Sequence, residues 1–166
     1  MTVSNGQQEA ARLERAVGAF LDRLPAVPER LLHTPPAEGE WSIGELAAHS
    51  AEIYSYWAKQ IDFLRANPGK PFGRTAADPD RISFVERHKN DPLDRLVAAI
   101  RASSAEGATA LRAYSDEQWR TVTGVHSARG EMDMDAISNL FIAGHAEEHL
   151  HQLEQTLTAL EHASAG

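Results

Sequence analysis

The stretch EWSIGELAAHSAEIY, residues 40–54, contains the clearest helix start in the chain and sets the frame for the whole fold. Within it, Ser42 and Glu45 have the spacing of a capping box, in which each side chain accepts a hydrogen bond from the other residue's backbone N–H. Apolar residues then recur at helical intervals as far as about Leu64. We therefore predict a long helix that begins at Ser42 and carries His49 on or beside its buried face.

Three further long helices are predicted from the same kind of pattern. Apolar residues recur at helical spacing in residues 7–24, in residues 91–114, and from position 133 or 135 to 162. In the second of these segments Asp91 has the position of an N-cap, because Pro92 follows it and proline is favoured at the first helical position. The chain therefore has four long helical segments.

Short elements and two connections separate the long helices. We expect one helical turn at ERLLH, residues 29–33, and another after Ser115 and Gln118, which form a second capping box. The connection 67–90 has no sustained period, and a crossing connection of this length is usually functional or mobile. The connection 121–133 is interpreted as irregular, with a small hairpin as an alternative.

These segments predict an all-α protein. Four long helices, one long crossover between the second and the third, and no convincing strand beyond the fragment TVTGV make a four-helix bundle the default architecture. The 166 residues, of which 42% are hydrophobic, suit one helical-bundle domain over residues 1–166, with its core in about 7–162.

The composition limits the classes of function. The chain has no cysteine, which excludes disulfides, thiolate zinc sites and a protein thiol nucleophile, and which fits a cytoplasmic protein. A net charge of −8, with no basic block, disfavours nucleic-acid binding. The N-terminus lacks the apolar region of a signal peptide, and no apolar run approaches the roughly 20 residues that cross a bilayer. We expect a small-molecule substrate, without nucleic acid or membrane as a partner.

The segment GHAEEHLHQLEQ, residues 144–155, contains three of the eight histidines and allows three interpretations. As H-x-x-E-H it matches an inverted zinc-peptidase pattern, but few residues follow His149 to supply the further acidic ligand. As Glu148-x-x-His151 it gives half of a di-iron site, but the sequence has no second such pair. As H-x3-H, His145 and His149 lie one turn apart on a helix and can share one metal ion.

A helical wheel favours the third interpretation. At 100° per residue, His149 lies about 40° from His145, Gln152 lies about 20° to the other side, and all three border the apolar stripe. His151 lies at about 240°, on the polar face. Since two ligands are too few, His49 is the candidate for a third, although spacing alone leaves ordinary core or boundary histidines as the alternative. The other histidines are interpreted as loop or surface residues without a role: His33, His88, His126 and His162.

Two segments together resemble signatures of the DinB/YfiT-like superfamily. EWSIGELAAHSAEIY resembles its second-helix signature, a Trp-Ser helix start before a metal-binding histidine, and HAEEHLHQLEQ resembles its fourth-helix signature, His-x3-His followed by glutamine. The resemblance extends over roughly residues 11–160. It implies a four-helix bundle with a divalent metal ion, usually nickel or zinc, held here by His49, His145 and His149. It also implies that Gln152 packs behind or supports these ligands.

The resemblance also implies a range of activities. The better-understood branches are transferases and isomerases that use low-molecular-weight thiols such as bacillithiol or mycothiol, and other members look like metal-dependent hydrolases. We therefore expect a metal-dependent thiol S-transferase that activates a small thiol or a water molecule. A YfiT-like hydrolase and a non-catalytic bundle with a structural metal or none are the alternatives. A homodimer is implied by the family alone.

One position departs from the family pattern. Many members have a further histidine just before the second ligand of the fourth helix, where this chain has Glu148. The three-histidine set stays intact, but the charge beside it changes. Any of Glu45, Glu52 and Glu148 could accept the second N–H of a ligating histidine, but we interpret each as a surface acid and none as a catalytic base. We expect residues 67–90 and 122–131 to determine the substrate.

Overall fold

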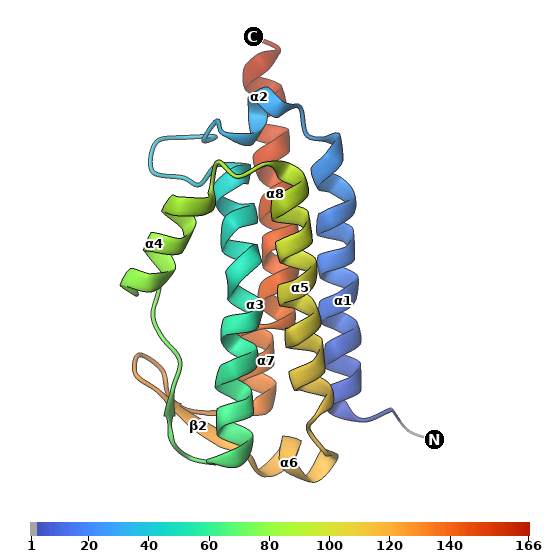
Figure 1. The fold of residues 1–166 in the computed structure, drawn as a ribbon, viewed down its shortest axis with the longest axis vertical. Coiled ribbons are helices and arrows are strands. Elements are labelled where there is room, and N and C mark those ends of the chain that lie inside the picture. The colour runs from blue at the N-terminus through green and yellow to red at the C-terminus, as the bar shows by residue number, and fades with distance from the viewer. Residues whose placement is uncertain (1–2) are drawn as a thin grey trace.

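Four long helices lie side by side along the long axis of the molecule (Figure 1). The structure is a computed structural model, and it describes residues 3–166. The four helices are α1 (Asn5–Arg23), α3 (Ile43–Ala66), α5 (Leu93–Arg112) and α8 (Ala143–Ser164). The prediction of an all-α four-helix bundle is confirmed, and one small three-stranded sheet is added to it.

Short elements connect the long helices. Five of them are helical: η1 (Leu24–Ala26), α2 (Glu29–Leu32), α4 (Pro79–His88), α6 (Asp116–Thr121) and α7 (Met134–Phe141). The strands are β1 (Pro71–Phe72), β2 (Thr123–His126) and β3 (Gly130–Asp133). No helix in the described part of the chain is long and apolar enough to cross a membrane.

The predicted capping boxes form as expected. The backbone N–H of Ser42 donates to Glu45 Oε2 at 2.8 Å, and the N–H of Glu45 donates to Ser42 Oγ at 3.2 Å. Ser115 and Gln118 make the same reciprocal pair at the start of α6. These contacts satisfy backbone donors that have no partner within the helix, so the start of each helix is fixed by nearby residues alone.

The N-cap predicted at Asp91 is wrong. Pro92 itself occupies the cap position of α5, and the carboxylate of Asp91 lies 2.8 Å from His88 Nδ1 instead. The same Asp-Pro signal occurs earlier in the chain, where Asp78 does cap α4 by accepting from Arg81 N at 3.0 Å. The carboxylate of Asp91 therefore contacts the nearby His88 and does not cap α5.

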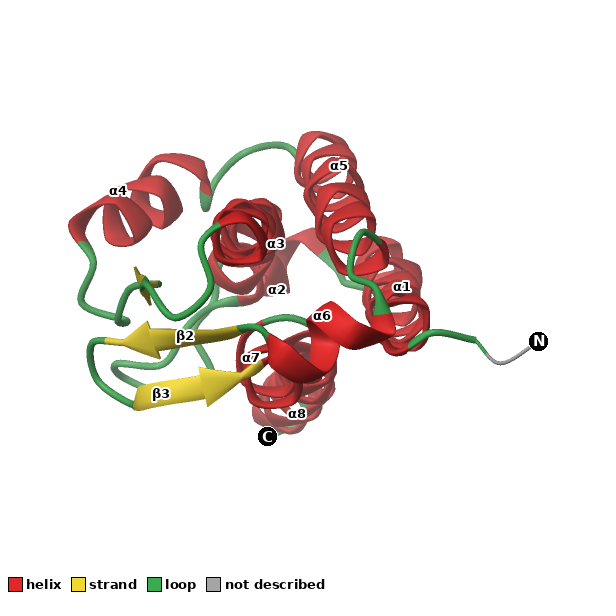
Figure 2. Ribbon diagram, turned by 90° about the horizontal axis from the view of Figure 1, so that it is seen from below, coloured by secondary structure: helices red, strands yellow, loops and turns green. Residues whose placement is uncertain are grey.

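The crossover 67–90 is more ordered than the sequence suggested. It contains β1 and α4. The sequence feature that could have predicted α4 is its N-cap, Asp78, followed by Pro79. β1 pairs in parallel with β2, which forms an antiparallel hairpin with β3, so the hairpin alternative for residues 121–133 is confirmed. Figure 2 shows the sheet and α4 on the same side of the molecule, beyond α3. The two connections thus meet and cover one flank of the bundle.

The last predicted helix is in fact two helices. α7 ends at Phe141, and Ile142 (φ −125°, ψ −91°) leaves the helical region before α8 begins. The chain packs tightly at this joint, because a Cβ on Gly144 would lie 2.0 Å from the carbonyl oxygen of Asn139. The site residues predicted on this segment, His145, His149 and Gln152, all lie in α8, beyond the break, so their relative positions on the helix are unaffected.

Candidate metal centre

Three histidines meet between α3 and α8. His49 comes from α3, and His145 and His149 come from α8. One nitrogen from each ring lies within 4.8 Å of the other two, which is close enough for all three to hold one metal ion. The ring centroids of His49 and His149 are 5.0 Å apart, and those of His145 and His149 are 4.1 Å apart. The structure thus brings together the three residues that the sequence analysis singled out.

Local helix geometry explains why these side chains converge. His145 and His149 are one turn apart on α8 and share a face, as the wheel predicted. His49 lies on the buried face of α3 and is 1% exposed, while His149 is 5% exposed. His151, on the opposite face of α8, is exposed as expected. The site is therefore formed where two long helices present one inward face each.

Each imidazole has a side-chain oxygen near it that comes from the residue three positions further along its own helix. In each pair the contact is made by Nδ1, which leaves Nε2 as the ligand atom if Nδ1 carries the proton. The pairs are His49 with Glu52 at 3.2 Å, His145 with Glu148 at 3.5 Å, and His149 with Gln152 Oε1 at 3.4 Å. The arrangement matches the usual support of metal-binding histidines, whose second ring nitrogen is held by an acceptor.

The contacts of the two buried histidines differ in quality. Glu52 lies at ion-pair distance from His49 Nδ1 but off the hydrogen-bond direction, so this contact is chiefly electrostatic. Gln152 accepts from His149, and the opposite nitrogen, His149 Nε2, is buried with no hydrogen-bond partner among residues 3–166. A buried polar atom without a partner costs about 1–3 kcal/mol. His149 belongs to the three-histidine group, so this unpaired nitrogen is the candidate ligand atom.

The three imidazoles are held in the neutral form. Burial lowers the pKa of His145 to about 4, with help from the neighbouring His49 and from the positive charge of Arg81. Burial also lowers the pKa of His49 and, to well below its ordinary value, the pKa of His149. A metal ion binds neutral imidazole, so the site is ready for a ligand role at neutral pH.

The side chain of Glu52 is largely buried, at 9% exposed, and its interpretation as a surface residue is wrong. Arg74 Nη2 donates to its carboxylate at 2.6 Å, and the guanidinium of Arg74 lies 3.8 Å from the centre of the Tyr56 ring. Burial raises the pKa of Glu52, but the contact with His49 and the hydrogen bonds from Arg74 outweigh this effect, so the pKa is below its usual value. The carboxylate stays charged and holds His49 from behind.

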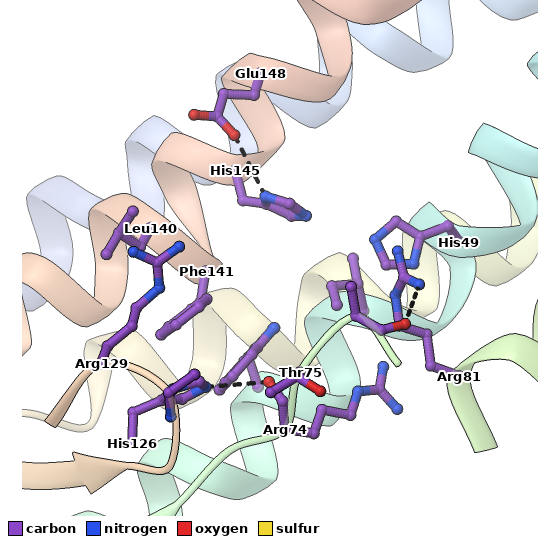
Figure 3. Close-up of a pocket in the computed structure, with 14 residues that line it drawn as sticks. His49, Arg74, Thr75, Arg81, His126, Arg129, Leu140, Phe141, His145 and Glu148 are labelled. Carbon is purple, nitrogen blue, oxygen red and sulfur yellow. Dashed lines mark hydrogen bonds and ion pairs between the residues drawn. The ribbon is translucent and has the colours of Figure 1, made fainter. Parts of the chain in front are cut away.

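A cavity of about 390 Å³ opens beside His49 and His145 (Figure 3). Its walls come from α3, α4, the hairpin and the α7–α8 joint. Besides the two histidines, it is lined by Ile53, Trp57, Arg74, Thr75, Ala76, Arg81, His126, Ala128, Arg129, Leu140, Phe141 and Glu148. Both connections that were expected to determine the substrate therefore contribute to its wall.

His126 was interpreted as a loop or surface residue, and this is wrong. Its side chain is buried, with Nε2 3.1 Å from the carbonyl oxygen of Arg74 and Nδ1 accepting from Ala128 N. The ring stacks on Phe141 at 5.1 Å. The alternating pattern of a strand could have predicted this burial, because in β2 Gly124 and His126 are buried and Val125 is exposed. His126 shapes the cavity but lies outside the three-histidine group.

Comparisons with solved structures place the fold among helical bundles. YfiT from Bacillus subtilis, described as a probable metal-dependent hydrolase with an unusual four-helix bundle topology, superposes with a TM-score of 0.77 at 14% identity. The match covers 99% of this chain and 91% of YfiT. A mycothiol-dependent maleylpyruvate isomerase matches with a TM-score of 0.68 at 14% identity, over 95% of this chain and 63% of that one.

A third solved structure, TT2238, a four-helix bundle protein, gives a TM-score of 0.54 at 22% identity, over 91% of this chain and 99% of TT2238.

Sequence comparison identifies the family. A search of curated protein sequences finds no match. The model of the DinB superfamily matches residues 12–153. The chain therefore belongs to the DinB superfamily.

Proposed function

We propose that this protein is a metal-dependent enzyme in which His49, His145 and His149 hold a divalent ion, nickel or zinc. The observation that carries the proposal is the buried Nε2 of His149, which has no partner in the described chain and belongs to a ring grouped with those of His49 and His145. The residues present fit such an ion. Three nitrogens converge within 4.8 Å, and a side-chain oxygen lies within 3.5 Å of Nδ1 of each ring.

When bound, the ion would supply Lewis-acid chemistry, lowering the pKa of a small thiol or a water molecule. The chain's own residues set the conditions for this. Neutral imidazoles leave the positive charge of the ion undiminished, and Glu52, fixed by Arg74, orients His49. Trp57, Phe141 and their neighbours add an apolar wall to the cavity beside the histidines.

Thiol S-transfer is the activity we propose first. The chain has no cysteine, so any thiol must enter from solvent, and the cavity has the size of a small-molecule pocket. The matched maleylpyruvate isomerase is described as mycothiol-dependent. We propose by analogy that a low-molecular-weight thiol is the cosubstrate and that a second small molecule receives it.

Hydrolysis is the second candidate. Its support is YfiT, which is described as a probable metal-dependent hydrolase and matches nearly the whole chain. In this case a water molecule takes the place of the thiol beside the three histidines. The same side chains serve both reactions, so the choice depends on what enters the cavity.

One set of measurements tests both candidates. The protein is purified without chelators, its metal content is measured, and turnover is assayed with electrophiles plus mycothiol or bacillithiol and with ester and amide substrates. Metal-dependent thiol consumption supports transfer, and thiol-independent turnover supports hydrolysis. The catalytic proposal fails if the chain binds no stoichiometric divalent ion. It also fails if metal removal unfolds the protein and no metal-dependent turnover is found, which would indicate a structural ion.

We also propose that the protein is a homodimer, on the basis of the family resemblance alone. Light scattering on the eluting peak of a size-exclusion column tests this. A mass of twice the chain supports the dimer, and a mass of one chain at micromolar concentration contradicts it.

A further inference from the structure

The cavity is cationic although the protein is acidic. The chain has a net charge of −8, yet three arginines line the cavity: Arg74, Arg81 and Arg129. Glu148 is the only carboxylate among the lining residues. A local charge opposite to that of the whole protein concentrates field in the cavity and favours ligands of the opposite sign.

Arg74 is already neutralised. Its guanidinium is 2.6 Å from the buried carboxylate of Glu52, 3.6 Å from Asp78, and packed on Tyr56. Its role is thus to fix Glu52. The charge that is left for a ligand must come from the other two arginines.

Arg81 has a fixed position but no acid partner. Its Nη1 donates to the carbonyl oxygen of Ala76 at 2.9 Å, and its guanidinium lies 5.0 Å from the centre of the Trp41 ring. Within residues 3–166, no carboxylate lies at ion-pair distance from it. Its positive charge lowers the pKa of His49, His145 and His149 alike, and Figure 3 shows it beside His49. A half-buried, preorganised guanidinium therefore stands next to the three-histidine group.

Arg129 extends from the turn between β2 and β3. It is exposed and makes no ion pair with any described residue. Figure 3 shows it near Leu140 and Phe141, on the opposite side of the cavity from Arg81. It is placed to meet a charged group at the rim.

We infer that the cavity binds a substrate or cosubstrate through an anionic oxygen group, a carboxylate or a phosphate, held by Arg81 beside the metal position and attracted at the rim by Arg129. A guanidinium offers planar paired donors that match either group. The inference rests on the proposed function for the identity of the site. The arginine contacts themselves do not need the metal and can be tested without it.

The test is calorimetric titration of the full chain, metal-free and nickel-loaded, with succinate, with its neutral diamide and, for the metal-free chain, with inorganic phosphate. The variants are R81Q, R81K and R129Q. R101Q is the matched control, because Arg101 is exposed on α5 and has no ion pair among the described residues. Circular dichroism confirms that each variant is helical before titration.

We expect wild type to bind an anion and not the diamide. R81Q should weaken anion binding by about tenfold or more, since hydrogen bonds to charged groups are the strong ones. R81K should fall between, because it keeps the charge but loses the paired donors. R129Q should weaken binding by about two- to fivefold, less at high salt, as for an exposed charge. A preference for succinate or phosphate identifies the class of group.

Several results would overturn the inference. They are equal anion binding by R81Q and wild type in the nickel-loaded protein, binding of the diamide as tight as succinate, an equal loss in R101Q, or no anion binding in either form. If the chain takes up no metal but shows binding that depends on Arg81, the proposed function fails and this inference stands. If the chain takes up metal and shows turnover but its anion binding does not depend on Arg81, the proposed function stands and this inference fails.

Discussion

The two faces of α8 are stabilised in different ways. Toward α1, the helix carries surface acids that are matched by arginines: Glu147 with Arg12, through Nε at 2.7 Å and Nη2 at 2.6 Å, and Glu154 with Arg23 at 2.7 Å. Toward α3, the same helix presents His149, whose Nε2 is buried and has no hydrogen-bond partner in the described chain. Polar groups are satisfied on one face and left open on the other.

The difference separates structure from function. Buried polar atoms nearly always have a hydrogen-bond partner, and an unpaired one destabilises the fold. An unpaired buried nitrogen therefore indicates a role other than stability. The acids toward α1 could be replaced with little loss because they are half-exposed. The histidines toward α3 are the positions where a ligand would complete the bonding.

The largest effect is expected from removing a ligand. His149→Ala should reduce bound nickel or zinc from about one ion per chain to near zero. Loss of a supporting residue typically costs about 10- to 100-fold in affinity, and loss of a ligand should cost more. His151→Ala, two residues further and exposed, should retain the ion. Elemental analysis of dialysed protein checks this, and equal metal content in the two variants would contradict it.

Neutralising a buried acid should cost more stability than neutralising an exposed one. Glu52→Gln leaves the buried Arg74 without its closest carboxylate, which typically costs about 3–5 kcal/mol. Asp78, at 3.6 Å, should keep the loss near the lower end. Glu147→Gln removes the half-exposed partner of Arg12 and should cost less than about 1 kcal/mol. Urea unfolding of the metal-free variants measures both, and similar losses would show that burial does not distinguish the pairs.

Acid should destabilise the metal-free protein through its histidines. The pKa of His145 is about 4 when folded and about 6.5 when unfolded, so between these values the unfolded chain binds more protons. Stability should therefore fall as pH drops from about 6.5 to about 4, by at most about 3 kcal/mol from this residue.

Urea midpoints measured from pH 7 to pH 4 check this pH dependence. His145→Gln should flatten the profile, whereas His151→Gln, at an exposed position, should leave it unchanged. The explanation fails if His145→Gln has the same slope as wild type.

A glycine-to-alanine substitution should be more destabilising at the joint between α7 and α8 than on the surface of α1. Gly144→Ala places a Cβ 2.0 Å from the carbonyl oxygen of Asn139 and should cost about 1–3 kcal/mol. Gly18→Ala, in α1, meets no atom within 4 Å and should gain about 0.5–1 kcal/mol from helix propensity. Thermal unfolding gives the sign of each change, and a stabilising Gly144→Ala would refute the close packing.

The smallest effect is expected behind a ligand. Gln152→Ala removes the acceptor at 3.4 Å from His149 Nδ1, and it should weaken metal binding by about tenfold. Gln155→Ala, at an exposed position of the same helix, is the control. Competition with a chromophoric chelator measures the affinities. No difference between the variants would reduce Gln152 to a packing residue.

The sequence predicted the parts of the site that depend on one helix at a time. The side-chain period of a helix placed His145 and His149 together and turned His151 away, and the Ser42 capping box fixed the start of α3. It did not reveal that Glu52 is buried, because the acid is covered by Arg74 from the crossover, 22 residues away. The spacing of Glu52 three residues after His49 was visible, but its burial was not.

By itself, then, the sequence determined the four long helical segments, the capped start of α3 and the faces on which the histidines lie, since these follow from contacts within one or two turns. Tertiary structure decided what meets those faces. The pairing of β1 with β2 joins segments more than 50 residues apart and closes the cavity. α4 brings Arg81 to the histidines, and the break at Ile142 ends α7 before the site. Such contacts depend on how distant elements pack, which no local pattern encodes.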